Sequence, residues 1–413
     1  MNAFVVLVPF HYYLFRSIYR NLKDSVFIIP PMENKKMSDN YGSGMSGVGL
    51  YNYMASFLKN KQVNTIEYGE ITKDNFIKYI SENVNCIICP HYFDGIDEIQ
   101  NTRVFKIVYG IPNNDSDQFN YKSHFNVDLI FTSGPESSKR FRERKFTSLA
   151  VGNPLFDFWF SSQFDDVALE TIRSKLIESK PTILYLPTHC YYSSIDQFGD
   201  TIIALAQKYN IIVKLHHATF NGEANRLCKF ISIPEIITLG DFFDPVILHK
   251  VADIVLTDVS GALFDRLLIK KPVIMLVNSL LKYKVAILSP KQQSAPVEES
   301  GLFPYTENPD DVEVLIENNL YKNVSVNEDL LYSLFYKRDG LAGERIAEAI
   351  LNDREYPAIS TPEKYERAIE NAPDEKSREF VITKRNYLMK KYHNLPAEKP
   401  SLLQRVLKRL SFG

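Results

Sequence analysis

The sequence predicts an α/β protein made of two doubly wound lobes in tandem, with a basic helical extension at the C-terminus. Short apolar runs alternate with amphipathic segments of helical spacing, which is typical of parallel sheets covered by helices. The alternation comes in two series that meet near residue 170, and the composition changes after about residue 356. A chain of 413 residues also exceeds the usual size of one hydrophobic core. We therefore expect lobes over residues 1–170 and 171–355 and an extension over residues 356–413.

The first lobe opens with an apolar run at residues 4–10, which reads as its first strand. Further strands are expected at residues 25–31, 64–69, 85–90, 104–110 and 127–134. Helices are expected between them at residues 51–60 and 74–83. The segment 152–160 closes the lobe, and a charged helix over residues 165–179 leads out of it.

The second lobe repeats the pattern. Its strands are expected at residues 182–190, 210–217, 235–240, 253–261 and 271–278. Helical segments at residues 310–320 and 339–353 end the series. Since ligands bind doubly wound sheets at the carboxyl ends of the strands, the residues that follow each apolar run are the candidates for function.

Composition and charge exclude several classes of protein. An apolar fraction of 45% and a charged fraction of 24% are ordinary for a soluble chain, and a net charge of −2 gives no argument for nucleic acid. No segment reaches the roughly 18 apolar residues that span a bilayer. The N-terminus lacks the basic region and the small-residue cleavage site of a signal peptide, so we expect a cytoplasmic chain.

Two of the four cysteines form a CxxC pair, Cys86 and Cys89. A redox pair of the thioredoxin type would lie at a helix start, whereas these two flank isoleucines within a strand-like run. Cys190 and Cys228 are isolated in the sequence. The pattern favours buried core thiols at residues 86 and 89 over redox chemistry or half of a zinc site.

The C-terminal extension is basic. From Lys376 to Gly413, ten Lys or Arg residues stand against two Glu. On a helix, the last residues would place apolar side chains on one face and basic ones beside it: Leu403, Val406, Leu407 and Leu410, with Arg405, Lys408 and Arg409. Such a helix either lies in an anionic membrane surface or packs its leucines on the protein, and both interpretations stay open.

A glycine-rich segment, Gly42 to Gly47, matches the spacing GxGxxG and precedes an expected helix. In a dinucleotide-binding turn the glycines follow a strand directly, but here a polar stretch separates them from the strand at residues 25–31. A flexible loop at the cleft is the favoured interpretation, with a dinucleotide site as the alternative.

Three strand ends of the second lobe carry polar side chains. They deliver Thr188 and His189, then Lys214, His216 and His217, and finally Asp258, Ser260 and Gly261. The third lies at a helix start, whose open N–H groups suit a phosphate. Together these ends supply a hydroxyl, imidazoles and an ammonium group without a carboxylate cage, which suits a pyrophosphate leaving group without a metal.

Each of these residues also has a structural interpretation. Asp258 or Ser260 could simply cap the helix, a lone histidine is more often structural, and a lysine at a strand end is usually solvated. A metal site at His189, His216 and His217 is not favoured, because adjacent histidines on a strand point to opposite faces.

These motifs resemble, in order and spacing, the CDP-glycerol glycerophosphotransferase family of teichoic-acid primases and polymerases. In the second lobe the resemblance rests on "LYLPTHC", "IIVKLHH", "ADIVLTDVSGALFDRLLIKKPVIML" and "RDGLAGERIAEAI". In the first lobe it rests on "FKIVYGIPNN", "VDLIFTSGPESSKRF" and "AVGNPLFDF". It covers roughly residues 85 to 350 and is more specific in the second lobe.

The resemblance implies a GT-B fold, in which two Rossmann-like lobes enclose the active site. It implies transfer of a polyol phosphate from a CDP-linked donor to an acceptor hydroxyl, with release of CMP and growth of a teichoic-acid-like or capsular polymer. His216 falls on the family's lysine-leucine-histidine motif, and Asp258 and Ser260 fall on its aspartate and serine turn. No metal or other cofactor is expected.

The chain departs from the family pattern at three positions. The family usually has a histidine, a candidate base, before the glycine of a first-lobe motif, and here Tyr109 precedes Gly110. Gly261 replaces a second serine, and His217 replaces a proline. A tyrosine with a pKa near 10 is a poor base at neutral pH, which leaves four other candidates. These are His91, Asp94, His124 and His11.

The sequence therefore predicts a metal-independent GT-B transferase. The expected catalytic residues are His216, Lys214, His189 and Tyr109, and the expected donor-binding residues are Thr188, Asp258, Ser260, Gly261 and Gly110. The acceptor would be a polyol phosphate or a saccharide, free or lipid-linked, and the chain would lie in the cytoplasm or on the inner face of the cell membrane. Three alternatives stay open: a nucleotide-sugar glycosyltransferase, a UDP-sugar 2-epimerase, and a degenerate binder without activity.

Overall fold

The structure is a computed structural model of the chain. It describes residues 1–31, 47–67, 72–91, 93, 95–111, 121–190, 193–240, 242–258, 260–278, 286–288, 294–296, 301–322, 324–352 and 359–392. The expected C-terminal membrane helix lies outside this part, as does the glycine-rich segment except for Gly47.

A seven-stranded parallel sheet forms the centre of the first lobe, in the order β3-β2-β1-β4-β5-β6-β7. Its strands are β1 (Asn2–Val5), β2 (Ser25–Ile29), β3 (Thr65–Glu67), β4 (Cys86–Cys89), β5 (Arg103–Val108), β6 (Leu129–Thr132) and β7 (Ser148–Ala150). Its helices are α1 (Pro9–Asn21), α2 (Gly47–Asn60), α3 (Lys73–Asn83) and α4 (Pro135–Glu143), with short 3₁₀ turns at Ile96–Glu98 and Tyr121–Ser123. Cys86 and Cys89 are buried in β4, as the sequence predicts.

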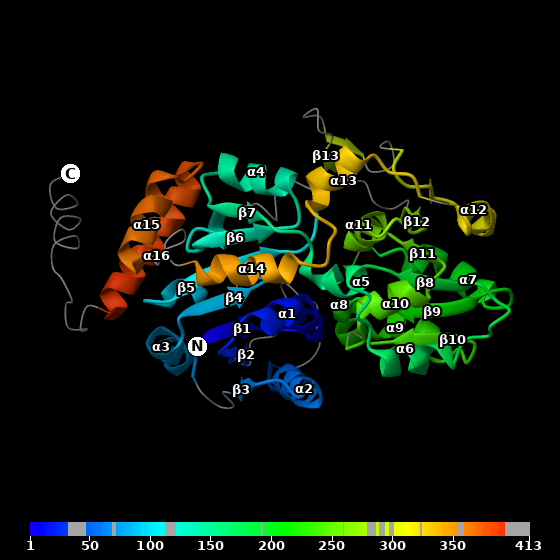
Figure 1. Ribbon diagram of the computed structural model, residues 1–413, viewed down its shortest axis with the longest axis horizontal. Coiled ribbons are helices and arrows are strands. Elements are labelled where there is room, and N and C mark those ends of the chain that lie inside the picture. The colour runs from blue at the N-terminus through cyan, green and yellow to red at the C-terminus, as the bar shows by residue number, and fades with distance from the viewer. Residues whose placement is uncertain are drawn as a thin grey trace.

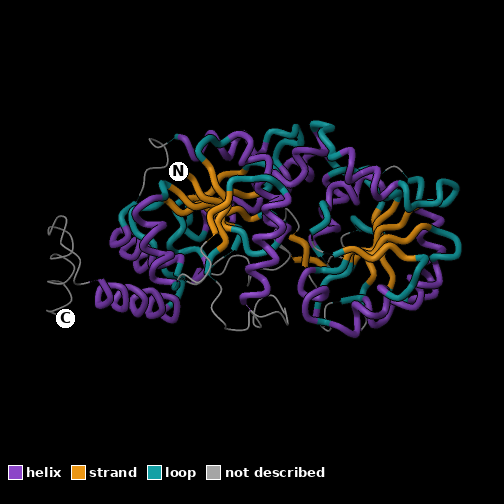
Figure 2. The backbone as a smooth tube through the Cα atoms, turned by 90° about the horizontal axis from the view of Figure 1, so that it is seen from below, coloured by secondary structure: helices purple, strands orange, loops and turns teal. Residues whose placement is uncertain are grey.

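The second lobe has a six-stranded parallel sheet in the order β10-β9-β8-β11-β12-β15. Its strands are β8 (Thr182–Leu186), β9 (Asn210–Lys214), β10 (Ile236–Leu239), β11 (Ile254–Thr257), β12 (Val273–Leu276) and β15 (Tyr305–Thr306). Its helices are α7 (Ile195–Leu205), α8 (His217–Gly222), α9 (Ala224–Ile231), α10 (Pro245–Val251), α11 (Gly261–Leu268) and α12 (Val312–Asn319), the last preceded by a 3₁₀ turn at Pro309–Asp311. An antiparallel pair, β13 (Ala286–Leu288) and β14 (Ser294–Pro296), is separate from the sheet. Figure 2 shows the two sheets as separate fans of strands, each surrounded by helices.

The first strand is shorter than the sequence predicts. Strand β1 ends at Val5, and helix α1 already begins at Pro9, inside the expected strand. Proline suits the first position of a helix, where its missing N–H is not needed. Because β1 and the start of α1 are both buried, the apolar run continues across their junction and does not mark it.

The lobes are joined by segments that cross between them twice. The first crossing runs through a 3₁₀ turn (Pro154–Phe156), α5 (Asp157–Phe160) and α6 (Asp166–Arg173). The chain returns through α13 (Glu328–Phe335), which contacts both α11 and α4. Helix α14 (Ala342–Leu351) then packs on α1, so it belongs by its contacts to the first lobe (Figure 1).

The C-terminal pair α15 (Thr361–Glu370) and α16 (Glu375–Tyr392) also packs on the first lobe, at its outer end (Figure 1). Lysines of these two helices form ion pairs with buried carboxylates of the first lobe. Lys364 lies 2.6 Å from Asp128, Lys384 lies 2.9 Å from Asp97, and Lys391 lies 2.6 Å from Glu98. Part of the positive charge of the extension therefore anchors its own helices.

Candidate functional site

Each sheet has one point at which the strand order reverses. At this point the segments that follow the two neighbouring strands run to opposite faces of the sheet. In the first lobe this point lies between β1 and β4, and in the second between β8 and β11. A crevice opens outside the carboxyl ends of the strands at such a point. His11 and His91 follow the first pair of strands, and the Thr188 and Asp258 segments follow the second.

At the point of strand reversal in the second lobe, between β8 and β11, the buried side chain of Asp258 holds the loop that follows β8. Its carboxylate accepts hydrogen bonds from the backbone N–H of Thr188, at 2.9 Å to both oxygens, and from the N–H of Ser194 at 3.0 Å. The hydroxyl of Ser194 donates a further bond at 3.1 Å. The side chain is fully buried, and burial raises the pKa of Asp258 to about 7 against the opposing effect of these bonds. Asp258 thus holds the loop that carries Thr188 and His189.

The turn after Asp258 presents the open start of α11. Ser260 is the N-cap residue, and its hydroxyl accepts from the N–H of Ala262 at 3.2 Å and lies 2.9 Å from the hydroxyl of Thr257. At Gly261 a side chain would meet no atom within 4 Å, so space is open in front of the helix. The helix start is both capped, as the structural interpretation expects, and accessible to an anion.

Imidazoles line the same crevice. The ring of His216 stacks on that of His189, with centroids 4.4 Å apart, and lies 4.0 Å from that of His217. His216 caps α8 by accepting from the N–H of Ala218 at 3.2 Å. Burial first, and then the neighbouring imidazoles and Lys214, lower the pKa of His216 well below its usual value and that of His217 to about 3. Burial also lowers the pKa of His189.

These histidines are therefore neutral at pH 7 in the free protein. A bound pyrophosphate would add negative charge and raise their pKa values, because an opposite charge favours the protonated form. Lys214, at the end of β9, lies close enough to His216 and His217 to lower their pKa values. The constellation suits an anionic ligand.

The first lobe contributes Tyr109 and Gly110, which follow β5, and His91, which follows β4. The hydroxyl of Tyr109 lies 3.1 Å from Nε2 of His91. Burial raises the pKa of Tyr109 to about 12 and lowers that of His91 to about 4, with Lys106 adding to the second effect. His11 packs its ring 5.4 Å from that of His91 and accepts from the N–H of Leu7 at 3.1 Å through Nδ1.

Residues from the two lobes influence one another across the crevice. His91 lowers the pKa of His217, and His217 lowers that of His11. Asp265, on α11, raises the pKa of Tyr109. The fold therefore brings His11 and His91 of the first lobe within electrostatic range of His217, and Tyr109 within range of Asp265.

One of the four fallback bases, His124, does not join this constellation. His124 is buried in the first lobe between the rings of Phe141 and Phe146, at centroid distances of 5.0 and 5.6 Å. Asp94 lies outside the described residues.

Asp265 is a group that the sequence prediction missed. It lies in the second turn of α11, and burial raises its pKa to about 7. An acidic residue within the otherwise apolar run "GALFDRLL" was the available signal.

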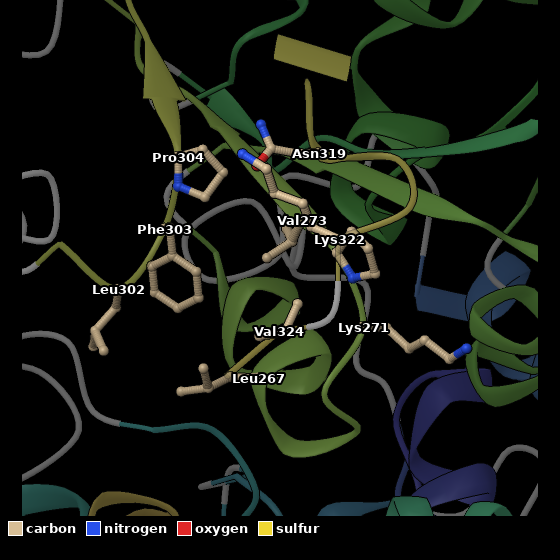
Figure 3. A pocket seen from close by; sticks show the side chains of 10 residues that line it. Leu267, Lys271, Val273, Leu302, Phe303, Pro304, Asn319, Lys322 and Val324 are labelled. Atoms are coloured by element: carbon tan, nitrogen blue, oxygen red, sulfur yellow. The ribbon is translucent and has the colours of Figure 1, made fainter. Parts of the chain in front are cut away.

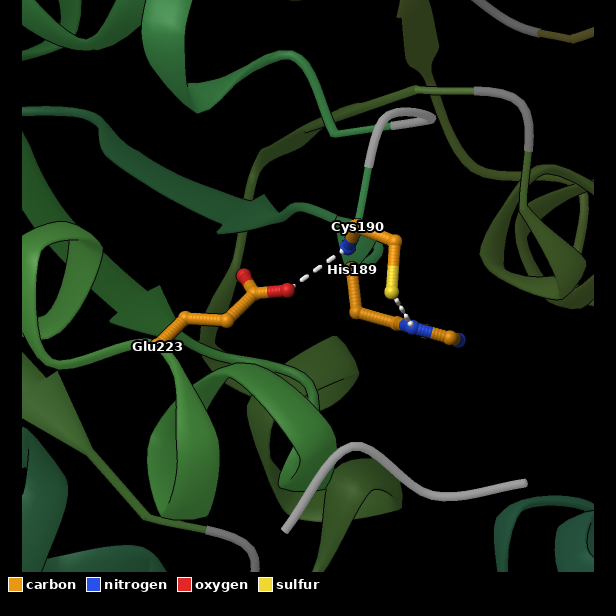
Figure 4. Close-up of side chains that lie close together, drawn as sticks. All are labelled: His189, Cys190 and Glu223. Atoms are coloured by element: carbon orange, nitrogen blue, oxygen red, sulfur yellow. Dashed lines mark hydrogen bonds between the residues drawn. The ribbon is translucent and has the colours of Figure 1, made fainter. Parts of the chain in front are cut away.

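Three possible metal ligands have their ligand atoms within 4.8 Å of one another: His189, Cys190 and Glu223 (Figure 4). Nδ1 of His189 lies 3.0 Å from the sulfur of Cys190, whose backbone N–H donates to Glu223 at 2.8 Å. Glu223 also forms an ion pair with Arg226 at 2.8 Å. The guanidinium already neutralises the carboxylate and would repel a cation, so the group fits a metal poorly.

A small pocket of about 50 Å³ lies elsewhere on the second lobe (Figure 3). Pro272 and Pro304, which line it, precede β12 and β15. It therefore opens at the amino ends of these strands, at the edge of the sheet opposite to the crevice.

Comparisons with known proteins agree with this architecture. A sequence model of the CDP-glycerol:poly(glycerophosphate) glycerophosphotransferase family matches residues 110–352, more than half of the chain. The fold is similar to that of the wall teichoic acid polymerase TagF, with a TM-score of 0.56 and 16% identity over 86% of this chain and 89% of that chain. It is also similar to UDP-GlcNAc 2-epimerase from Neisseria meningitidis, with a TM-score of 0.52 and 14% identity over 85% and 99% of the two chains. No curated protein matches the sequence significantly.

The structural likenesses confirm the two-lobed α/β fold that the sequence predicts. Within the described residues, no helix has the length and hydropathy needed to cross a bilayer.

Proposed function

Since the chain belongs to the CDP-glycerol:poly(glycerophosphate) glycerophosphotransferase family, it is a transferase of substituted phosphate groups, and we propose that its donor is CDP-glycerol or a closely related CDP-polyol. The proposal is carried by the second point of strand reversal, where Asp258, just before the open start of α11, bonds to the N–H of Thr188. His189, in the same loop, stacks on His216, and Lys214 lies close enough to lower the pKa of His216. This side of the crevice provides N–H donors and positive charge, and a pyrophosphate requires both.

In the proposed reaction the acceptor hydroxyl oxygen attacks the β-phosphorus of the donor in line. A phosphodiester bond forms to the acceptor, the bond between the β-phosphorus and the bridging oxygen breaks, and CMP leaves with the electron pair. Lys214 and His216 counter the charge on the pyrophosphate, and the backbone N–H groups at Gly261 orient it. Thr188 and Gly110 line the donor from the two strand ends on either side.

The chain's own cationic and N–H groups supply the charge stabilisation in this scheme, so we propose that no metal cofactor is needed. Treatment with EDTA is then expected to leave the transfer rate unchanged. A loss of activity that Mg²⁺ restores would contradict this part of the proposal.

For the acceptor we propose a polyol phosphate or a saccharide of a growing cell-surface polymer, with the chain working at the inner face of the cell membrane. The basic residues between 399 and 409 motivate this location. Truncation after residue 396 is expected to reduce sedimentation with anionic liposomes while leaving the melting temperature unchanged. Equal sedimentation of both proteins would assign the segment to another role.

Calorimetric titration with CMP, CDP-glycerol and UMP tests the donor. We expect CMP and CDP-glycerol to bind in preference to UMP, and Ser260→Ala to weaken both, because the serine shapes the phosphate turn. A preference for UMP would favour a UDP-sugar enzyme on the same fold. Absence of binding by all three would leave Ser260 as a helix cap alone.

Turnover is measured with CDP-glycerol, CDP-ribitol and UDP-GlcNAc, each with a glycerol phosphate oligomer as acceptor. Release of CMP together with elongation of the oligomer is the expected result. Binding of a CDP-polyol with no turnover on any acceptor would indicate a binding protein without activity.

A further inference from the structure

The proposed transfer releases a proton from the acceptor hydroxyl. In the proposed reaction, Lys214 and the histidines of the second lobe supply positive charge to the pyrophosphate. A separate candidate for the proton acceptor lies on the first-lobe side, beside the carboxyl ends of β4 and β5.

Two side chains at this edge form a hydrogen-bonded pair. Strands β4 and β5 are parallel neighbours, so the residues that follow them, His91 and Tyr109, emerge side by side. Nε2 of His91 and the hydroxyl of Tyr109 are 3.1 Å apart. Tyr109 keeps its proton because burial raises its pKa to about 12, and His91 is neutral because burial lowers its pKa to about 4. In the His91 tautomer that carries its proton on Nδ1, the hydroxyl donates to Nε2.

The pair is held in place from three directions. The ring of Phe10 packs on that of Tyr109 at a centroid distance of 5.0 Å, and the ring of His11 packs on that of His91 at 5.4 Å. The hydroxyl of Ser133 donates to the backbone carbonyl of Tyr109 at 3.3 Å. Such support fixes the orientation of both polar atoms before substrate arrives.

We propose that Tyr109 and His91 act as one proton relay, in which the acceptor hydroxyl gives its proton to the Tyr109 oxygen while Tyr109 passes its own to Nε2 of His91. The inference rests on the proposed transferase function. The acceptor oxygen, left with its electron pair, bonds to phosphorus, and CMP takes the electron pair of the broken bond. Tyr109 ends neutral and His91 ends as an imidazolium, so charge and protons balance.

Asp265 is the alternative proton acceptor, because it lies within electrostatic range of Tyr109. The negative charge of the bound donor favours His91 over Asp265. Asp265 lies on α11, the helix whose start faces the pyrophosphate, and a nearby anion would hold the proton on its carboxyl group. The same anion stabilises an imidazolium at His91. His91 lies within electrostatic range of His217, which places it near that anion.

His11 is excluded by its surroundings. It is 1% exposed, and its Nδ1 already accepts from the N–H of Leu7. Among the described residues it is covered from solvent, and its ring packs against that of His91.

The test compares His91→Asn, Tyr109→Phe and the double variant with the wild type in single-turnover transfer from CDP-glycerol to a glycerol phosphate oligomer. Each single variant is expected to slow transfer by about 10²- to 10⁴-fold, the usual contribution of general-base catalysis. The double variant should be no slower than the singles, because two members of one relay are lost together. CMP affinity should stay at the wild-type value in all three.

Two further variants separate a relay from a structural role. Tyr109→His in the His91→Asn background places an imidazole where the tyrosine oxygen stood, and it should recover part of the rate and introduce an acidic limb in the pH profile. Tyr321→Phe, an exposed tyrosine of the second lobe, serves as the matched control and should transfer at the wild-type rate.

The proposal is overturned if both single variants retain transfer within threefold of the wild type, or if the double variant loses the product of the two single losses. It is also overturned if only Asp265→Asn abolishes transfer. If the wild-type protein binds no CDP-polyol and releases no CMP, the proposed function itself fails, and that result is visible before any variant is made.

Discussion

At the scale of single residues, Asp258 shows how one buried side chain can hold the segment that carries candidate site residues. Its carboxylate collects the N–H groups of Thr188 and Ser194 and the hydroxyl of Ser194, all from the segment that follows β8. The positions of Thr188 and His189 in the crevice therefore depend on a group buried behind them.

Replacement of Asp258 by asparagine is expected to destabilise this arrangement. One carboxylate oxygen becomes an NH₂ group that faces N–H donors, and buried donors are left without an acceptor. The free energy of unfolding should fall by about 1–3 kcal/mol, and CMP should bind more weakly. Urea denaturation and calorimetry measure the two effects. Asp310→Asn, on the exposed turn before α12, is the control, and an equal response of both variants would refute the interpretation.

The raised pKa of Asp265 leads to a prediction of how the stability of the fold depends on pH. Its folded pKa of about 7 exceeds the value near 4 of an unfolded chain, so between these values the folded protein binds more protons. Stability should therefore fall as the pH rises from about 4 to 7. Asp265→Asn removes this contribution and should raise the melting temperature at pH 8, by on the order of 1 kcal/mol in stability, but not at pH 5. Parallel melting curves for both proteins at the two pH values would contradict it.

The sequence predicted which residues stand at the strand ends but not which way they point. Thr188, His216 and Ser260 were identified because they follow apolar runs at the carboxyl edge of a doubly wound sheet. That Asp258 turns inward, and that His91 reaches Tyr109, depends on side-chain direction and on contacts between separate strands. Neither is encoded in local spacing.

At the scale of elements, the crossing of α14 over α1 depends on one glycine. A Cβ atom built at Gly343 would lie 2.5 Å from the Ser17 hydroxyl oxygen and 2.7 Å from the Ser17 carbonyl carbon. The second of these atoms is backbone and cannot move aside, so the two helices approach closely only because residue 343 has no side chain.

Gly343→Ala is accordingly expected to force α14 away from α1 and to lower the free energy of unfolding by about 1–3 kcal/mol, despite the better helix propensity of alanine. Gly199→Ala, in α7, is the matched control, because its Cβ would meet only the flexible side chain of Lys229. Urea denaturation of both variants decides the point. A stabilised Gly343→Ala protein would show that the crossing can relax.

Most strands were predictable because each is a short buried run bounded by polar or turn residues. The boundary between β1 and α1 was not, since the two elements are buried in succession and the apolar run does not change its character at Pro9. Helices and strands are told apart by apolar residues that recur every 3.6 or every 2 positions. Where every side chain is buried, successive positions are apolar and neither period can be seen.

At the scale of the whole molecule, an ion pair fastens the lobes beside the crevice. Arg16 of α1 pairs with Asp244, the N-cap residue of α10, and the guanidinium also lies over the ring of Phe158 at 4.1 Å. Nearby, the hydroxyl of Tyr13 donates to the carbonyl of Phe242 at 2.6 Å. These contacts join the first lobe to the second.

Arg16→Met keeps the length of the side chain but leaves Asp244 buried without its cation. A loss of about 3 kcal/mol in unfolding free energy is expected, together with slower transfer. The single tryptophan, Trp159 in α5, lies in the connection between the lobes and reports their separation by fluorescence. Arg20→Met is the control, because Arg20 also lies over the ring of Phe158, at 4.4 Å, but donates to the neutral amide of Gln163 where Arg16 meets a carboxylate. It should change stability by less than about 0.5 kcal/mol. Equal losses would show that the ion pair has no special role.

The two-lobed plan was predictable from the double alternation of strands and helices. The placement of α14 and of α15 with α16 on the first lobe was not, because an amphipathic pattern shows that a helix has a buried face but not which sheet covers that face. The basic residues of α16 were counted in the positive excess of the C-terminal extension, yet Lys384 and Lys391 meet buried carboxylates about 290 residues earlier in the chain.

The return of α14 to the first lobe has a consequence during synthesis. The carboxylate of Asp157 accepts from the N–H groups of Ala342 and Gly343, at 3.0 and 2.7 Å, so the two crossings meet at one point. The ribosome must make the entire second lobe between these partners, which takes roughly 10–40 s at bacterial-type elongation rates. The face of α1 around Ser17 stays uncovered for that interval. The first lobe can therefore complete its packing only after the second lobe has been made.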